Sequence, residues 1–296
     1  MFGQTRFAAM NAAFNARLGE YGTLVAVHRG TGLASIVENT RDAVTAAVAS
    51  GGDLVEIDVV ASADGEFFAF HDGNERRLLG VDMAILDLPA AQIDTLRYVH
   101  ADRPGRVSRV ERLLDLLAHF RGSTLFNVDR SWHWWPTLLP ALDGLDMPGQ
   151  LLLKSRAWDG EHARLLREHP VKYPYMPICG SVEDAFAHLD DPELNTVGVE
   201  LLATDASSPF LDAAFVADLR RRGVFVLVNA EVLTTGVPLF AGYDDEAAVL
   251  GSPEQGWGPL FELGVDVIQT DWPWLLRDYR NTRVPASREV SDGVAS

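Results

Sequence analysis

Short apolar runs alternate with amphipathic stretches along most of the chain. An apolar run of roughly four to eight residues between turn-forming residues is typical of a buried strand, and apolar residues at three- and four-residue spacing predict a helix. We predict strands at residues 23–28, 54–60 (extended after a turn by 66–70), 124–129, 150–154, 173–179, 196–201, 224–228 and 265–270. The predicted helices are residues 41–50, 109–120, 136–142, 161–168, 182–189, 211–222, 246–263 (broken) and 274–279.

Eight strands that alternate with helices, on runs apolar enough to be buried from both sides, predict a (β/α)8 TIM barrel. A doubly wound open sheet is the second choice, because such sheets usually have fewer units. We predict one domain over residues 1–283. Residues 73–108 are too long for a simple loop and predict an insertion after strand two. Residues 284–296 are small and polar and predict a flexible tail.

Composition narrows the classes of partner. The chain has 296 residues, 47% of them hydrophobic, and a formal net charge of −17. This charge argues against nucleic-acid or anionic-membrane binding, but a bound cation can still reverse the field at a local site. The single cysteine, Cys179, fits a reducing compartment. The first 20 residues lack a continuous apolar core, and no segment reaches transmembrane length. We therefore expect a cytoplasmic protein without a stable membrane anchor.

Polar residues collect where the predicted strands end, which is the active-site face of a barrel. A lone histidine at such a position is more often structural, but a large set on one rim is costly without partners or a function. The residues at or near these strand ends are His28, Glu56, Asp58, His71, Asp129, Lys154, Glu200, Asn229 and Asp271.

The densest part of this set predicts a chemistry. Glu56 and Asp58 are two residues apart in a strand, so both side chains lie on one face. Carboxylate oxygens suit a hard cation such as Mg2+ or Ca2+. His28 and His71 are suited to proton transfer at neutral pH, and Arg29 to binding a phosphate or carboxylate. Together these residues indicate metal-assisted hydrolysis of an anionic substrate.

The same residues resemble the glycerophosphodiester phosphodiesterase family. The similarity is dense from about residue 24 to residue 72 and returns at Gly264-Val265-Asp266 and Thr270-Asp271-Trp272-Pro273. The motifs of the first block are His28-Arg29-Gly30, Glu38-Asn39-Thr40, Glu56-x-Asp58, Asp64-Gly65 and His71-Asp72.

The resemblance implies a barrel with one divalent cation, held by Glu56, Asp58 and an acid from strand three. It also implies that His28 and His71 are the general acid and base and that Arg29 is a phosphate ligand. The chain departs from the family at strand three, where the family usually has a Glu and a Lys two residues later. Here the sequence is Asp129-Arg130-Ser131. Asp129 can still bind a cation, as in the similar spider phospholipase D toxins. Lys154 could supply the missing positive charge, and we expect it to take part in binding the phosphate of the substrate.

Two further groups are substrate-binding candidates. Glu38-Asn39-Thr40 caps the helix that begins near residue 41, and we expect Glu38 to take part in the site as well. Trp132 and Trp272 follow strands three and eight, and their rings could stack on a sugar or a choline-like cation. Filling gaps between loops is the equally weighted alternative for each tryptophan.

The function predicted from the sequence is a metal-dependent phosphodiesterase. It would cleave a small glycerophosphodiester-like molecule to a phosphomonoester and an alcohol, and sugar- and choline-bearing diesters are the candidate substrates. Two alternatives stay open: a sugar-processing barrel enzyme, either an isomerase or a glycosidase, and a non-catalytic phosphodiester-binding protein. A glycosidase would need two carboxylates that flank the bond but no histidine pair.

Overall fold

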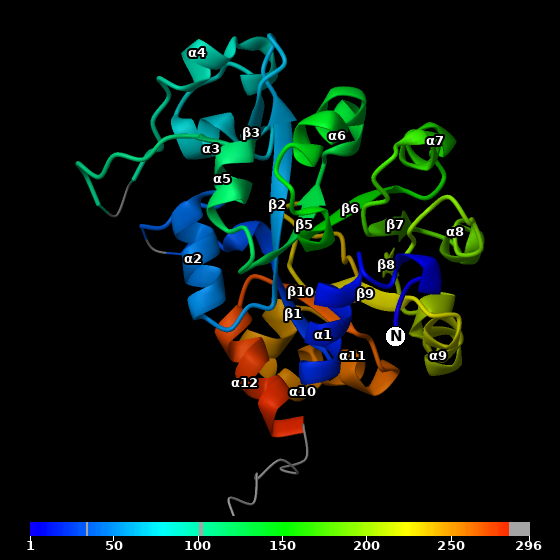
Figure 1. Ribbon diagram of the computed structural model, residues 1–296. Coiled ribbons are helices and arrows are strands. Elements are labelled where there is room, and N and C mark those ends of the chain that lie inside the picture. Colours follow the sequence, from blue (N-terminus) through cyan, green and yellow to red (C-terminus); the bar gives the residue numbers. More distant parts are fainter. Residues whose placement is uncertain (34, 101–102, 284–296) are drawn as a thin grey trace, which may run out of the picture.

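The barrel closes through its first strand. The computed structural model describes residues 1–33, 35–100 and 103–283. Within them, β1 pairs in parallel with both β2 and β10, so the sheet has no open edge between first and last strand. This closure confirms the TIM barrel and excludes the open sheet (Figure 1). The eight parallel strands are β1 (Leu24–Val27), β2 (Leu54–Ala61), β5 (Leu125–Asp129), β6 (Leu151–Arg156), β7 (Tyr175–Cys179), β8 (Gly198–Leu201), β9 (Phe225–Asn229) and β10 (Val267–Thr270).

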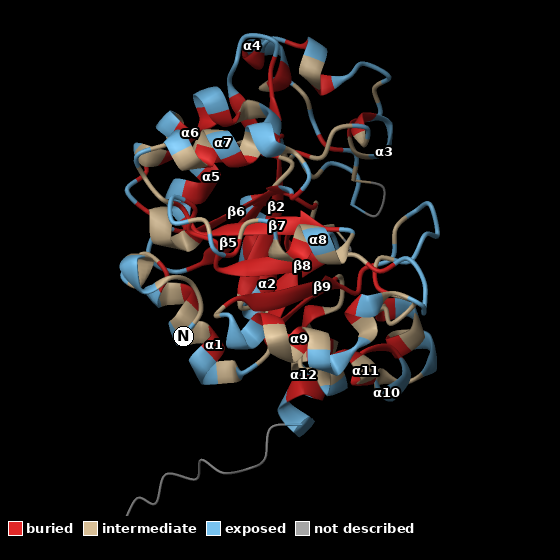
Figure 2. Ribbon diagram, turned by 90° about the vertical axis from the view of Figure 1, so that its right-hand side faces the viewer, coloured by how far each residue is buried: buried red, intermediate tan, exposed pale blue. Residues whose placement is uncertain are grey.

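Helices surround the barrel, with their apolar faces on the strands and their polar faces outward (Figure 2). They are α2 (Arg41–Ala49), α5 (Leu113–His119), α6 (Trp135–Asp143), α7 (Gly160–Glu168), α8 (Val182–Phe186), α9 (Ala213–Arg221), α10 (Pro253–Gly256), α11 (Gly258–Leu263) and α12 (Pro273–Arg283). The broken helix predicted at 246–263 is a π-helical turn over Ala247–Gly251 followed by α10 and α11. Pro253 begins α10, because its missing N–H costs nothing in a first helical turn.

The prediction that residues 66–70 extend the second strand was wrong. These residues contain β3 (Phe67–Ala69), which runs antiparallel to β2 and pairs with the short β4 (Glu111–Arg112). The chain reverses at Gly65, whose φ of +88° is readily adopted only by glycine. The helix predicted at 109–120 was also wrong at its start, because β4 occupies its first residues and α5 begins at Leu113.

The segment after β3 forms a small layer above the end of β2 (Figure 1). It contains α3 (Glu75–Leu79), a 3-10 turn over Ile85–Asp87 and α4 (Ala90–Ile93). Its apolar side chains form a separate cluster with the hairpin residues Phe68 and Phe70. The limits proposed for the domain and its insertion remain predictions, and the predicted tail at 284–296 lies outside the described residues.

A helix that we did not predict covers the other end of the barrel. In α1 (Ala12–Tyr21), Phe14 and Leu18 pack against residues that begin the strands, such as Leu24. The side-chain amides of Asn11 and Asn195 donate to each other's oxygen, both at 2.8 Å. With this end closed, the site must open at the carboxyl ends of the strands. No described helix has the length and apolar character needed to cross a membrane.

Candidate active site

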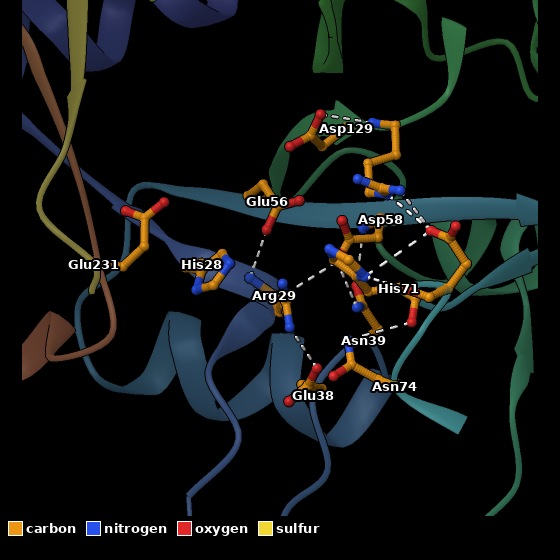
Figure 3. A network of polar contacts seen from close by, with 12 residues as sticks. His28, Arg29, Glu38, Asn39, Glu56, Asp58, His71, Asn74, Asp129 and Glu231 are labelled. Carbon is orange, nitrogen blue, oxygen red and sulfur yellow. Dashed lines mark hydrogen bonds and ion pairs between the residues drawn. The ribbon is translucent and has the colours of Figure 1, made fainter. Parts of the chain in front are cut away.

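Three carboxylates converge at the carboxyl end of the barrel. Glu56 and Asp58 come from β2 and Asp129 ends the neighbouring β5, where the strand register sets it beside Asp58. One oxygen of each carboxylate lies within 4.8 Å of the other two (Figure 3). Three carboxylate oxygens at this spacing suit a single hard cation.

The surroundings of Glu56 show whether the three carboxylates suit a cation. The side chain of Glu56 is 1% exposed, and its Oε2 accepts a hydrogen bond of 2.7 Å from the backbone N–H of Arg29. Oε1 is buried and has no hydrogen-bond partner among the described residues. Burial, and next the charge of Asp58, raise the pKa of Glu56 well above its usual range. A buried acceptor without a donor is costly, and a divalent cation would satisfy it while keeping the acid ionised. The triad therefore fits Mg2+ or Ca2+.

Lys154 lies on the far side of this triad. Its Nζ is 2.9 Å from Oδ2 of Asp129 and 2.9 Å from Oε2 of Glu200. The other carboxylate oxygen of Glu200, Oε1, accepts a hydrogen bond from Asn229. Burial alone would lower the pKa of Lys154, but the charges of Asp129 and Glu200 outweigh it and raise that pKa. Ser131, where the family usually has its lysine, is fully buried and donates to the carbonyl of Val128. The positive charge next to Asp129 therefore comes from β6.

Arg29 and the Glu38-Asn39-Thr40 segment hold the acids in place. Arg29 Nη1 donates to Glu38 at 2.9 Å, and its Nε lies 3.2 Å from Oδ2 of Asp58. Asn39 bonds Asp58 twice, from Nδ2 to Oδ2 and through Oδ1 to the backbone N–H. Thr40 is the helix cap, because its Oγ1 accepts from the N–H of Ala43. Glu38 is thus a link in the site: it also accepts from Arg77 of α3 at 2.7 Å.

His28 directly follows β1 and is bound to the residue that follows β10. Its Nδ1 lies 2.9 Å from Oδ1 of Asp271. Burial opposes the charged imidazole, but the hydrogen bond to Asp271 and the charges of Glu231 and Glu56 outweigh it and raise the pKa of His28 to about 10. The structure thus brings His28 to the edge of the acidic triad (Figure 3).

His71 lies across the mouth of the barrel, after β3. Its Nδ1 is 2.6 Å from the carbonyl oxygen of Asp72. The Asp72 carboxylate in turn accepts from Nε and Nη2 of Arg130, at 3.0 and 2.7 Å. Arg130 follows the triad residue Asp129, so a single strand end positions both a metal-ligand candidate and the turn that carries His71.

Two cavities open beside the histidines. We call the larger one, of about 730 Å3, the rim pocket, and the other, of about 570 Å3, the barrel pocket. His28, Arg29, His71 and Leu233 line both. A molecule bound at this shared wall could extend into either pocket.

The tryptophans differ in what they contact. Trp272 lines the rim pocket, whereas Trp132 and Trp158 line the barrel pocket. Trp135 is fully buried in the main core and donates from Nε1 to Ser131. Trp135 therefore cannot stack on a substrate, and the candidates are the three pocket residues.

Sequence reasoning missed several residues of this site. Glu231 follows β9 and lines the barrel pocket; its Oε1 accepts from Gln269, and burial raises its pKa to about 7. Asp271 had been noted only as a strand end, and the cross-links made by Arg77 and Arg130 had no sequence signal. For Glu231, the available signal was its position two residues beyond Asn229 at the end of a predicted strand.

A closed barrel with this constellation at its strand ends defines the class of (β/α)8 phosphoric diester hydrolases. The family model described as "Glycerophosphoryl diester phosphodiesterase family" matches residues 28–273. Since that match covers most of the chain, the protein belongs to this family. None of the curated proteins matches the chain.

Solved structures agree with the fold. A glycerophosphoryl diester phosphodiesterase from Parabacteroides distasonis is 17% identical, with a TM-score of 0.69 over 90% of this chain and 88% of that one. A phosphodiesterase from Oleispira antarctica, in complex with the product sn-glycerol-3-phosphate, is 19% identical, with a TM-score of 0.64 over 87% and 96%. A Thermotoga maritima glycerophosphodiester phosphodiesterase is also 19% identical, with a TM-score of 0.59 over 87% and 98%. At such identities these matches establish the architecture alone.

Proposed function

We propose that the protein is a divalent-cation-dependent phosphodiesterase that cleaves glycerophosphodiesters to a phosphomonoester and an alcohol. The observation that carries this proposal is the convergence of Glu56, Asp58 and Asp129 next to His28 and Arg29, two residues that line both pockets. The family supports the reaction class. The sn-glycerol-3-phosphate in the Oleispira antarctica structure supports glycerol phosphate as the phosphomonoester.

The roles divide between charge and proton transfer. Glu56, Asp58 and Asp129 would hold Mg2+ or Ca2+, which when bound stabilises negative charge that develops on the phosphoryl oxygens. Arg29 lines both pockets and binds the phosphate, while Lys154 pairs with Asp129 and holds it in position. Glu38 aligns Arg29. Trp132 and Trp272 contact the two ester substituents from opposite pockets.

Each histidine uses Nδ1 for a contact within the protein, with Asp271 for His28 and with the Asp72 carbonyl for His71. Nε2 is then the nitrogen that exchanges a proton with the substrate. One histidine takes the proton of the nucleophile, which is water or a neighbouring substrate hydroxyl that closes a cyclic phosphate. The other donates a proton to the oxygen of the departing alcohol.

The test is a panel of glycerophosphodiesters, each assayed for released alcohol and phosphomonoester with Mg2+, with Ca2+ and with excess chelator. We expect turnover with a cation and none with chelator. Hydrolysis of an uncharged glycoside in chelator would instead establish the sugar-processing alternative. Binding of diesters without turnover under any cation would establish a binding protein.

A further inference from the structure

The barrel pocket has a cationic mouth. Arg156 ends β6 and lines this pocket together with Trp158, which is 57% exposed. The guanidinium carbon of Arg156 lies over the indole ring of Trp158, 5.8 Å from its centroid. Within the described part of the chain, this guanidinium has no carboxylate within ion-pair distance. It is therefore held by an aromatic face while its hydrogen-bond donors remain available to a ligand.

The rim pocket combines carboxylates with cations, because Arg29 and Arg77 line it as well. Asp271 and Asp72 line it, and their side chains are 41% and 34% exposed. Trp272 lies on the same side. Asp271 pairs with His28 and Asp72 pairs with Arg130. The rim pocket therefore offers an aromatic ring beside paired charges, whereas the barrel pocket offers Trp158 beside Arg156, which no described carboxylate pairs.

The acids of the barrel pocket do not cancel this cation, because they lie deeper and are engaged. Asp129 and Glu200 bind Lys154, Asp58 binds Asn39, and Glu231 accepts from Gln269. Ile178, Leu202 and Leu239 supply apolar surface to the same pocket. A substituent in the pocket can thus contact apolar side chains as well as a guanidinium.

We propose that the barrel pocket selects diesters whose substituent there ends in an anionic group, a carboxylate or a second phosphate, with Arg156 as the specificity-determining residue. This inference rests on the proposed function. A planar guanidinium can bind either anion in a bidentate manner. A quaternary ammonium would meet a like charge, and the nearest exposed indole face is already occupied by Arg156. The choline-bearing substrates considered from the sequence are therefore disfavoured in this pocket.

The test uses three synthetic glycerol phosphodiesters of matched chain length that end in a carboxylate, a hydroxyl or a trimethylammonium. For the wild type, we expect kcat/KM to favour the carboxylate ester over the trimethylammonium ester by about tenfold, since both attraction and repulsion contribute. Arg156→Gln should bring this ratio close to one, and Arg156→Glu should reverse it. The hydroxyl ester is the reference for each protein, and the losses of the two charged esters are expressed relative to it.

Arg164→Gln is the matched control, because Arg164 lies in the next helix, is similarly exposed, and pairs with Glu161 and Glu168 outside the pockets. It should keep the wild-type ratio. The ratio should also shrink as salt is raised, because Arg156 is exposed. An unchanged ratio in both Arg156 variants, or a wild-type preference for trimethylammonium, would overturn the inference.

Failure of the proposed function gives a different result. If none of the three esters is turned over in the presence of Mg2+ or Ca2+, the phosphodiesterase proposal fails. The dissociation constants of the same esters, measured by calorimetry with the same four proteins, then decide the inference about Arg156. A carboxylate preference that disappears in Arg156→Gln would sustain it without any catalysis, and equal dissociation constants would refute it.

Discussion

The ammonium of Lys154 lies 2.9 Å from the carboxylate of Asp129, because strand register sets the ends of β6 and β5 side by side. Both side chains project into the barrel mouth, and Glu200 lies on the other side of the ammonium. We propose that Lys154 compensates for the lysine that the family usually carries on the third strand. It places a positive charge between Asp129 and Glu200, on the carboxylates that Arg29 does not contact.

Replacement of this lysine should weaken the metal-free protein. In Lys154→Met, Asp129 and Glu200 lose a buried countercharge, and we expect the free energy of unfolding in chelator to fall by about 3–5 kcal/mol. Added Mg2+ or Ca2+ should recover part of the loss, because the cation then supplies positive charge. Urea unfolding with and without cation measures both effects. The control Lys172→Met, which removes a lysine 3.7 Å from Glu193, should change stability by less than about 1 kcal/mol. Equal stability of Lys154→Met and wild type in chelator would contradict this role.

The metal proposal predicts a titration with one site per chain. Calorimetry with Mg2+ or Ca2+ should give a stoichiometry of one, and Glu56→Gln should weaken affinity by about tenfold or more, because a neutral amide replaces a carboxylate ligand. Glu66→Gln, on a surface carboxylate paired with Arg112, serves as the control and should bind normally. A variant Glu56→Gln with wild-type affinity would remove Glu56 from the ligand set.

The proton-transfer roles predict large losses of turnover. His28→Ala and His71→Ala should each lower kcat by roughly 10²–10⁴-fold with the fold retained, since each loses a general acid or base. His169→Ala is the control, because His169 contacts Asp143 away from the two pockets. If kcat of either site variant stays within a few-fold of wild type, that histidine is structural.

A buried acid at the opposite end of β10 predicts a pH effect on stability. Asp266 is 2% exposed; burial raises its pKa from 3.8 to about 6, although the N–H of Val226 and Arg220 oppose the rise. Between these pH values the folded chain binds more protons at Asp266 than the unfolded chain does. Its contribution to the free energy of unfolding therefore decreases as pH rises through this window, by about 3 kcal/mol in total.

Asp266→Asn carries no such proton. Relative to wild type, its free energy of unfolding should increase as pH rises from about 4 to about 7, and then level off. Urea unfolding at four pH values in this range measures the difference. Asp278→Asn, at an exposed site paired with Arg277, should show a nearly constant difference. A constant difference for Asp266→Asn as well would mean that its pKa is not raised.

The barrel was predictable because its signal is repeated. Eight buried apolar runs separated by helical spacing leave few alternative architectures, and strand alternation places Glu56 and Asp58 on one face whatever the rest of the chain does. Once the strands are known, His28 and Asp129 are expected at the carboxyl end of the barrel, because both residues stand where a strand ends and active sites of such barrels lie at that end.

The features that could not be predicted from the sequence depend on contacts in the folded chain. Trp132 and Trp135 are three residues apart and both belong to the main core, yet only Trp132, at the start of a 3-10 turn over Trp132–Trp134, also lines the barrel pocket. The pairing of Arg130 with Asp72 spans 58 residues and depends on how β3 folds back on β2. Helix α1 escaped notice because Asn15 and Arg17 interrupt its apolar pattern, although Phe14 and Leu18 are enough to bury one face.

Closure of β1 against β10 has a consequence for synthesis. The two strands are separated by about 240 residues, and the contact between His28 and Asp271 joins positions 243 residues apart. Until the ribosome has released β10, the first strand lacks one neighbour, His28 lacks its carboxylate partner and the β9 edge is unpaired. Contacts between such distant positions form late and leave partly folded chains exposed to aggregation. The nascent protein therefore acquires a complete site only when nearly all of it has been made, and any truncation before residue 267 should remove the closed barrel and the site together.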